Sequence, residues 1–538
     1  MVLGGCLLFL LAVLSAGTGF RAVKAGFEGH FLAQGGREVR DELTVVFSPG
    51  RPELDFRLSF LINEAQLFTA LYEGLFSYNP VTTSPIPALA ESWELSDDGR
   101  QWTFTIRENA RFSNGDRIVA EDFRRSWLSL LAPERQAPYS GLFDIIEGAK
   151  EYRSGETADA DSVGIVANGR TLTVRLRHPA AFFPSMLCHH SFSPIHKSMV
   201  NVGDWWTTKH VGNGPFRIGE LGEDRMILRA NSQYWDAGSV GLNALVIRFA
   251  DEDTASELWN SGQARWVSGG VNLETLTDRS GISVHTLFGT HFYFIRSAEP
   301  PFDDYRVRRA LALALPWEEL RAGHFLPAKT LIFPLQGYPE IDGLGDTDPA
   351  EAARLLAEAG FPGGKGLPEL VFRIPSADAA DTVALMADAW KEHLGVSSRV
   401  EVVPFADYFD ALAMGGYHVG SMSWIGDFPD PYSFLKMWQA DSNLNTAGLR
   451  DADFDRLMER SMSEEGTKRW ETMAEAEQLL LYRGSVLPIS FTPAINIIDT
   501  NELDGWFPNA LGIHPFKYFI FRELTPLPNV VMAVGGTN

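Results

Sequence analysis

Strict alternation of apolar and polar residues marks several short strands. Trp102, Phe104 and Ile106 alternate with two threonines and an arginine, and residues 171–176 (TLTVRL) repeat the pattern. Successive side chains of a strand point to opposite faces, so each segment predicts a strand with one buried face. Residues 41–48 (DELTVVFS) predict an earlier strand, which ends before a Pro-Gly pair.

Two other segments follow the period of a helix. Residues 64–74 place apolar side chains on one helical face and end at a glycine. Residues 349–359 predict a second helix with clearer ends. Asp348 can accept a hydrogen bond at its start, Pro349 suits the first helical position, and Gly360 suits the left-handed stop.

The second half of the chain alternates strands with helices. Residues 370–374 and 398–403 predict strands, and residues 380–394 between them predict a helix. A strand–helix–strand succession is typical of a sheet with helices on its faces. The chain is therefore predicted to be α/β. At 538 residues it is long enough for about two to four domains.

Composition restricts the partners of this chain. The formal net charge is −23 and no run of basic residues occurs. Binding to nucleic acid phosphates needs clustered Lys and Arg, so nucleic acid is not an expected partner. Aromatic residues make up 12% of the chain. Most of these rings are expected in the core, although some could line a ligand cleft.

The N-terminal residues have the character of an export signal. An apolar stretch of nine residues, 6–14, is too short to span a bilayer and fits the apolar region of a signal peptide. Residues 1–25 are thus expected to be a signal peptide or a retained N-terminal anchor, followed by a polar linker over 26–40. Cys188 is the only cysteine after this segment, so no disulfide forms within the mature chain. An exported protein of the bacterial envelope is expected, periplasmic or anchored at its N-terminus.

Motifs of common enzyme classes do not occur. The sequence has no G-x-S-x-G, H-E-x-x-H, Walker loop or G-x-G-x-x-G after a strand, which favours a protein that is not an enzyme. One cluster could hold a soft metal: Cys188, His189 and His190, with His196 nearby. Adjacent residues of a strand point to opposite faces, so the alternative is that these histidines satisfy local hydrogen bonds.

Several motifs in order resemble the family 5 extracellular solute-binding proteins, the oligopeptide- and dipeptide-binding receptors of ABC importers. They extend over about residues 41–525. The matching segments are 71–75 (LYEGL), 87–93 (PALAESW), 97–123, 212–216 (GNGPF), 301–311 (PFDDYRVRRAL) and 348–362.

The resemblance implies a periplasmic-binding-protein type II clamp, in which two lobes close over a ligand and an extra subdomain extends the first lobe. The expected parts are lobe I from 41–75, 200–286 and 496–538, the extra subdomain from 76–199, and lobe II from 287–495.

The resemblance also implies a function. Such a receptor captures short peptides between its lobes and delivers them to membrane permease subunits that work with an ATPase. It is expected to act as a monomer without a cofactor. Receptors of this family hold peptides extended, and their backbone pairs with the peptide as an added strand would. An enclosed peptide ammonium needs a carboxylate partner.

Residues 421–431 (SMSWIGDFPDP) resemble the family segment that supplies this carboxylate. In the oligopeptide-binding members the aspartate three residues after the tryptophan takes the ammonium, and here that residue is Asp427. The alternative for Asp427 is that it only caps a turn, a role expected of Asp430 before Pro431.

The resemblance assigns further ligand contacts. Trp424 is expected to pack beside the ligand, and Ser423 and Ile425 to offer backbone groups. Tyr139 matches a family tyrosine that faces the cleft. The remaining expected contacts are Gly269, Gly270 and Phe491.

Departures from the family leave the ligand open. Some members carry an arginine at the position of Ser421, which helps to hold the carboxylate of a short peptide. Some carry a glutamate in the loop around Phe60, where this chain has none, and hinge tyrosines are replaced over residues 490–492 (SFT). Peptide length is therefore undetermined. A metal chelate, haem or an oligosaccharide remains an alternative ligand, and a secreted hydrolase is a more distant one.

Overall fold

The computed structural model describes residues 42–522. The expected signal peptide or anchor (1–25) and linker (26–40) lie outside this range, as does the end of the predicted segment 496–538. Within residues 42–522, no helix is both long enough and apolar enough to cross a membrane.

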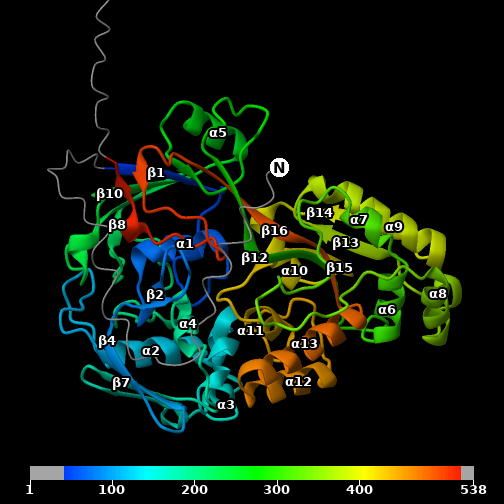
Figure 1. Ribbon diagram of the computed structural model, residues 1–538, viewed down its shortest axis with the longest axis horizontal. Coiled ribbons are helices and arrows are strands. Elements are labelled where there is room, and N and C mark those ends of the chain that lie inside the picture. The colour runs from blue at the N-terminus through cyan, green and yellow to red at the C-terminus, as the bar shows by residue number, and fades with distance from the viewer. Residues whose placement is uncertain (1–41, 523–538) are drawn as a thin grey trace, which may run out of the picture.

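Two long strands, β12 (Ile282–Ile295) and β16 (Val486–Ile498), connect the two halves of the molecule. They pair antiparallel in the middle of a ten-stranded sheet with the order β14-β13-β15-β12-β16-β11-β1-β10-β9-β8. Figure 1 shows both strands passing between the halves. Their register is interrupted between Thr286 and Thr290. The expected lobe boundaries, near residues 286 and 495, fall within these two strands.

Lobe I is built on the β1 side of this sheet. β1 (Glu42–Phe47) lies between β10 (Ala244–Phe249) and β11 (Trp266–Val267) and is parallel to both. The predicted first strand is thereby confirmed. The other elements are α1 (Ile62–Leu71), β8 (Phe216–Leu221), β9 (Arg225–Ala230), α5 (Glu252–Asn260), β17 (Leu503–Asp504) and β18 (Ile520–Phe521).

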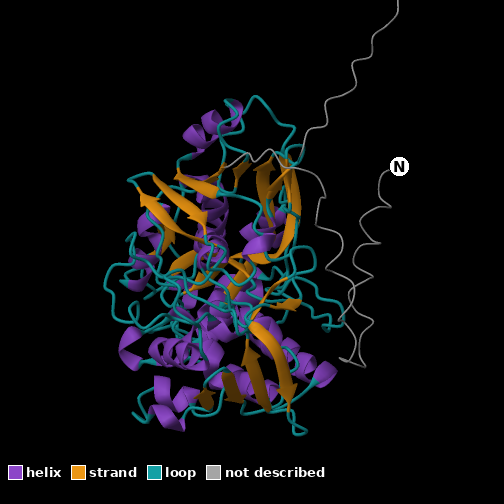
Figure 2. Cartoon of the chain, turned by 90° about the vertical axis from the view of Figure 1, so that its left-hand side faces the viewer, coloured by secondary structure: helices purple, strands orange, loops and turns teal. Residues whose placement is uncertain are grey.

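The extra subdomain carries its own four-stranded antiparallel sheet, in the order β4-β5-β7-β6. In β5 (Gln101–Ile106) the side chains of Trp102, Phe104 and Ile106 are buried, as the alternation predicts. The other elements are β2 (Phe76–Tyr78), β3 (Pro85–Pro87), β4 (Ala90–Leu95), α2 (Ala120–Leu131), α3 (Ala149–Arg153), β6 (Ile165–Asn168), β7 (Thr171–Arg175) and α4 (Phe183–Met186). Figure 2 shows strands distributed from the top to the bottom of the molecule, with helices and loops packed around them.

Lobe II contains the predicted strand–helix–strand unit. β13 (Leu370–Ile374) and β14 (Ser398–Val402) are parallel and are joined through α9 (Ala380–Leu394). β15 (Val419–Ile425) lies between β13 and β12. The surrounding helices are α6 (Tyr305–Leu313), α7 (Trp317–Arg321), α8 (Pro349–Glu358), α10 (Phe405–Ala413), α11 (Tyr432–Leu435), α12 (Ala452–Met462) and α13 (Gly466–Tyr482).

The predicted helix ends hold at α8 but not at α1. At α8 the Asp348 side chain accepts a hydrogen bond from the Glu351 N–H at 2.9 Å, and Gly360 has a φ of +98°. Helix α1 stops at Leu71, three residues before the expected glycine, because the Leu71 carbonyl accepts N–H groups from Asn213 and Gly214.

This contact joins two of the family-like motifs, 71–75 and 212–216. A Cβ at Gly214 would lie 2.4 Å from the Ala70 carbonyl oxygen, so only glycine allows the two backbones to approach this closely. The contact fixes the end of α1, which lies beside the site described below.

The buried histidine His210 couples the stability of this lobe to pH. Its ring contacts the Tyr72 hydroxyl, and burial lowers its pKa to about 4. In an unfolded chain a histidine ordinarily becomes protonated near pH 6.5, whereas in the folded chain His210 becomes protonated only near pH 4. The stability that His210 contributes is therefore fully present above pH 6.5 and is lost as the pH falls toward 4.

The free energy of unfolding should fall between pH 7 and pH 5 in both proteins. We expect this fall to be about 2 kcal/mol smaller in His210→Gln than in the unchanged protein. Urea unfolding at both pH values measures the difference. His324→Gln, at a half-exposed histidine, is the control and should leave the pH dependence unchanged. Equal losses in the His210 variant and the unchanged protein would contradict the expectation.

Candidate functional site

A cavity of about 770 Å³ lies between the two lobes and the extra subdomain. This volume is within the range of sites for small ligands, roughly 300–1,000 Å³. Lobe I contributes the start of α1 and the residues before it, and the extra subdomain contributes β2 and the segments around Tyr139 and His189. Lobe II contributes α10, β15 and residues 443–446. A ligand in this cavity contacts all three parts at once.

Asp427 lies at one end of the cavity, two residues after β15. The Tyr139 hydroxyl donates a hydrogen bond to Asp427 Oδ1 at 3.0 Å, and His189 Nε2 lies 3.5 Å from the same oxygen. The Tyr78 hydroxyl donates to the Asp427 backbone carbonyl at 3.2 Å. All three partners come from the extra subdomain, so Asp427 of lobe II is held by the opposite side of the cavity.

The electrostatics leave one carboxylate oxygen available. Burial, followed by the Asp427 charge, raises the pKa of Tyr139 well above its ordinary value, so the tyrosine remains a donor. The Asp427 side chain is 10% exposed. Hydrogen bonds from residues 42–522 to this side chain reach Oδ1 and none reaches Oδ2. A carboxylate oxygen accepts hydrogen bonds only, so Oδ2 suits an ammonium or another cationic donor.

The edge of β15 offers backbone groups along the same cavity. On one side β15 pairs with β12, and on the other side β13 pairs only with Val419 and Gly420. At Ser421 the N–H and C=O both bond to the Tyr408 hydroxyl at 3.0 Å. Backbone groups alternate in direction along a strand, so those of Ser423 and Ile425 point to the same open side.

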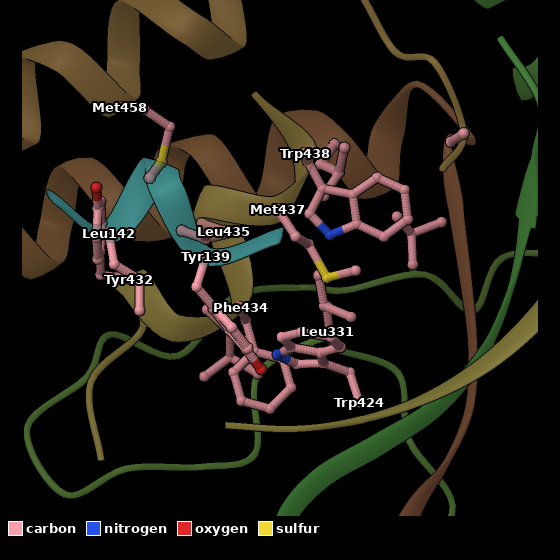
Figure 3. Close-up of a cluster of buried hydrophobic side chains, with 14 of the residues drawn as sticks. Tyr139, Leu142, Leu331, Trp424, Tyr432, Phe434, Leu435, Met437, Trp438 and Met458 are labelled. Atoms are coloured by element: carbon pink, nitrogen blue, oxygen red, sulfur yellow. The ribbon is translucent and has the colours of Figure 1, made fainter. Parts of the chain in front are cut away.

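Trp424 and Tyr139 form part of the cavity wall. Their ring centroids are 6.4 Å apart, and Trp424 Nε1 donates to the Ser433 carbonyl at 2.9 Å. In Figure 3 the segment that carries Tyr139 lies against the buried side chains of lobe II. Trp424 is therefore held by lobe II and presents one surface to the cavity.

The structure places three of the expected contacts outside the cavity lining. A Cβ at Gly269 would lie 3.0 Å from the Ser48 backbone N, so this glycine serves close packing within lobe I. Gly270 is exposed and lies beside the side chain of Glu252. Phe491 packs on Phe333 at a ring distance of 4.9 Å. A glycine or an aromatic residue in the sequence indicates a closely packed position, but it does not indicate whether the neighbour is a ligand or another part of the protein.

Other lining residues were not predicted from the sequence. Three phenylalanine rings line the cavity where lobe I contacts lobe II. The ring centroids of Phe60 and Phe409 are 5.0 Å apart, and those of Phe409 and Phe405 are 5.8 Å apart. Arg296, just after β12, lines the cavity near residues 443–448. Helical periodicity over residues 405–413 could have indicated α10, but no pattern indicates that it faces a ligand.

The cysteine–histidine cluster does not assemble as a metal site. Cys188 Sγ donates to the Ser77 carbonyl at 3.3 Å, and burial raises its pKa well above the ordinary value. His196 instead pairs with Asp116 at 2.9 Å. Residues 42–522 hold no group of three or more His, Cys, Asp or Glu side chains that could bind a metal ion. His189 alone of the cluster faces Asp427.

Asp430 supports the site from behind. It accepts the Tyr432 N–H at 2.9 Å, the turn role expected from the sequence, and also pairs with Arg469 at 2.7 and 2.9 Å. The Arg469 guanidinium lies 4.1 Å from the ring of Phe182, which belongs to the extra subdomain. This buried pair therefore shapes the turn that presents Asp427.

Charged side chains cross the boundary between lobe II and the extra subdomain. Lys436 Nζ lies 2.7 Å from Asp144, and Arg153 Nη2 lies 2.9 Å from Asp441. Arg153 also holds Asp144 on its own side at 2.6 Å. Although burial opposes it, Lys436 and Arg153 keep the pKa of Asp144 below its ordinary value. The cluster therefore favours the closed arrangement.

Loss of the Lys436 charge should loosen this closure. In Lys436→Gln, Asp144 keeps Arg153 but loses its partner in lobe II, at a cost to the closed form of about 1–3 kcal/mol. We expect a larger radius of gyration for the ligand-free variant by small-angle X-ray scattering. The exposed Lys468→Gln is the matched control. An unchanged scattering profile in Lys436→Gln would show that the cluster does not hold the lobes together.

Comparisons with known proteins identify the class of molecule. Residues 84–446 match the model of the bacterial extracellular solute-binding proteins, family 5. The periplasmic oligopeptide-binding protein OppA of Salmonella typhimurium is 30% identical over 528 residues, covering 91% of this chain and 93% of that protein. OppA of Bacillus subtilis is 27% identical, covering 84% and 87%.

Solved structures agree in fold. The murein tripeptide binding protein MppA of Escherichia coli superposes with a TM-score of 0.81 at 24% identity, covering 90% of this chain and 99% of that one. OppA of Haemophilus influenzae, in complex with RPPGFSPFR, gives 0.80 at 22% identity and the same coverage. MppA in its unliganded open form gives 0.62.

These findings define a two-lobed solute-binding protein of the α/β class, which confirms the expected type II clamp. The chain belongs to the bacterial extracellular solute-binding proteins of family 5.

Proposed function

We propose that this protein is the substrate-binding receptor of an ABC importer and captures short peptides in the cavity between its lobes. The observation that carries the proposal is the buried Asp427 carboxylate, just beyond the open edge of β15. One of its oxygens receives no hydrogen bond from residues 42–522. The relatives named as oligopeptide-binding proteins support the same ligand class.

Binding starts from the charge of the peptide N-terminus. An ammonium beside Asp427 Oδ2 is neutralised in a buried place where the attraction is less screened than in water. The hydroxyls of Tyr139 and Tyr78 keep the carboxylate in position from the other side. The peptide backbone then extends along β15 and pairs with Ser423 and Ile425, which is independent of peptide sequence.

A cation also lines the cavity near the start of β15. The backbone N–H of Arg296 donates to the carbonyl of His418, which directly precedes β15, at 2.8 Å, whereas Asp427 follows the strand. The seven residues of β15 between them span roughly 23 Å at about 3.3 Å per residue. The charged partner of Arg296 in the described chain is Glu299 at 3.2 Å, which is mostly exposed. A zwitterionic peptide of several residues therefore meets opposite charges at its two ends.

The relatives named as oligopeptide-binding proteins favour a peptide ligand over the alternative ligands and over a hydrolase. YgiS of Escherichia coli, at 27% identity, is instead named a probable deoxycholate-binding protein. We therefore propose a receptor without catalytic activity or cofactor. Exported to the envelope as a monomer, it passes its ligand to membrane permease subunits and their ATPase. The net charge of −23 continues to disfavour nucleic acid.

Replacing Asp427 tests the proposal directly. Asp427→Asn keeps the shape of the side chain and removes its charge, so affinity for peptides with a free N-terminus should fall by about a hundredfold or more. Isothermal titration with a mixed set of tri- to hexapeptides measures the loss. Asp410→Asn removes an exposed aspartate that lines the same cavity and is the matched control.

The unchanged protein should bind N-acetylated peptides about as weakly as the Asp427 variant binds free ones. Native mass spectrometry of protein purified directly from cells should show bound masses that fit short peptides. A homogeneous non-peptide ligand, or unchanged affinity in Asp427→Asn, would contradict the proposal.

If Arg296 pairs with the peptide carboxylate, peptide affinity should depend on a free C-terminus. In Arg296→Gln the carboxylate of a peptide that reaches this residue loses its charged partner, and affinity should fall by about tenfold. A series from dipeptides to octapeptides, each with a free and an amidated C-terminus, locates the length at which the effect begins. Equal losses for free and amidated peptides of every length would show that Arg296 does not bind the carboxylate.

A further inference from the structure

His189 lies at the ammonium-binding end of the cavity but has no part in the proposed binding. It precedes the short turn His190–Phe192, and its side chain is 5% exposed. Its ring packs edge-on against Tyr139 at 4.4 Å, the residue that donates to Asp427. His189 Nε2 itself lies 3.5 Å from Asp427 Oδ1. The imidazole and a bound ammonium would therefore share one carboxylate.

The hydrogen bonds of His189 decide which nitrogen carries the proton. The Ser191 N–H donates to His189 Nδ1 at 3.4 Å, so in the neutral ring Nδ1 is an acceptor and the proton lies on Nε2. That proton faces Asp427 across 3.5 Å, which is longer than a normal hydrogen bond. Neutral His189 thus touches the carboxylate only weakly. Protonation would occur at Nδ1 and give the ring a full positive charge beside Asp427.

None of the other titratable groups described around His189 carries a positive charge that could pair with Asp427 in its place. The His190 ring packs on Phe68 at 5.0 Å and on His189 itself at 3.9 Å, and desolvation lowers its pKa well below the ordinary value, so it remains neutral. Tyr139, Tyr78 and Cys188 have their pKa values raised by burial and remain uncharged.

Negative groups near His189 come from two elements. Asp427 follows β15, and Glu64 of α1 acts on the same Tyr139 from lobe I. Burial raises the pKa of Glu64, whose carboxylate accepts hydrogen bonds from the Ser59 hydroxyl at 2.6 Å and the Glu53 N–H at 2.7 Å. Asp427 is therefore the carboxylate at which a charged His189 and a ligand ammonium would compete.

We propose that His189 makes ligand capture pH-dependent: when protonated it pairs with Asp427 and competes with the ligand ammonium, and when neutral it leaves the carboxylate to the ligand. The inference rests on the proposed binding of an ammonium at Asp427. Histidine is the side chain that ordinarily changes charge between pH 5 and 8. Since proton and ligand exclude each other, ligand binding must also release a proton.

The test uses a tripeptide with a free N-terminus between pH 7.0 and 5.5. In this window the peptide ammonium keeps its charge, because it ordinarily titrates near pH 8. Glu64→Gln controls for the carboxylate near Tyr139 whose pKa is raised by burial. Isothermal titration of the unchanged protein should give affinity about fivefold to twentyfold weaker at pH 5.5 than at 7.0. In His189→Gln the affinity should change little between these two pH values, whatever its level at pH 7.0.

His196→Gln, at a histidine that pairs with Asp116 outside the cavity lining, is the matched control and should keep the pH profile of the unchanged protein. A second measurement needs no variant: titrations at pH 6.0 in buffers of different ionisation enthalpy count the protons released on binding. About half a proton or more per peptide is expected from the unchanged protein.

A pH-independent affinity, a profile that persists in His189→Gln, or no proton release would overturn the role of His189 while leaving the peptide site intact. No peptide binding even at pH 7.0 would instead overturn the proposed function itself.

Discussion

The pairing of β12 with β16 is the constraint on which the rest of the molecule depends. Both strands run through the main sheet from one lobe to the other, and their register breaks between Thr286 and Thr290. A strand pair that remains hydrogen-bonded on both sides of such a break can bend there while each lobe stays rigid. The same pair places β15 beside β12, and so fixes where the open strand edge lies.

Charge then decides how the lobes meet. Asp427 belongs to lobe II, yet its side-chain partners Tyr139 and His189 belong to the extra subdomain. A buried carboxylate needs donors that compensate for the loss of water, and these partners reach Asp427 only where the extra subdomain meets lobe II. The pairs of Lys436 with Asp144 and of Arg153 with Asp441 act at the same boundary. In the proposed function, these buried ions would couple ligand binding to lobe closure.

Local pattern predicted individual elements well. The strand at β5, the unit β13–α9–β14 and both ends of α8 follow from side-chain period and capping residues that act over a few positions. The end of α1 does not, because carbonyl acceptors at Leu71 are taken by a backbone segment about 140 residues away. Within the site, too, some features follow from local sequence and others depend on tertiary packing. Its β15 segment follows a motif, whereas the placement of Gly269 depends on packing within lobe I.

The sequence by itself determined the family-like order of motifs, the α/β class and the position of Asp427 next to a strand end. These depend on residues close together in the chain, where spacing alone sets direction and period. The tertiary structure decided what reaches Asp427. His189 and Tyr139 lie 238 and 288 residues before it, and only the folding of the extra subdomain onto lobe II brings them to one carboxylate. Electrostatic interaction depends on distance in space and on burial, neither of which sequence spacing records.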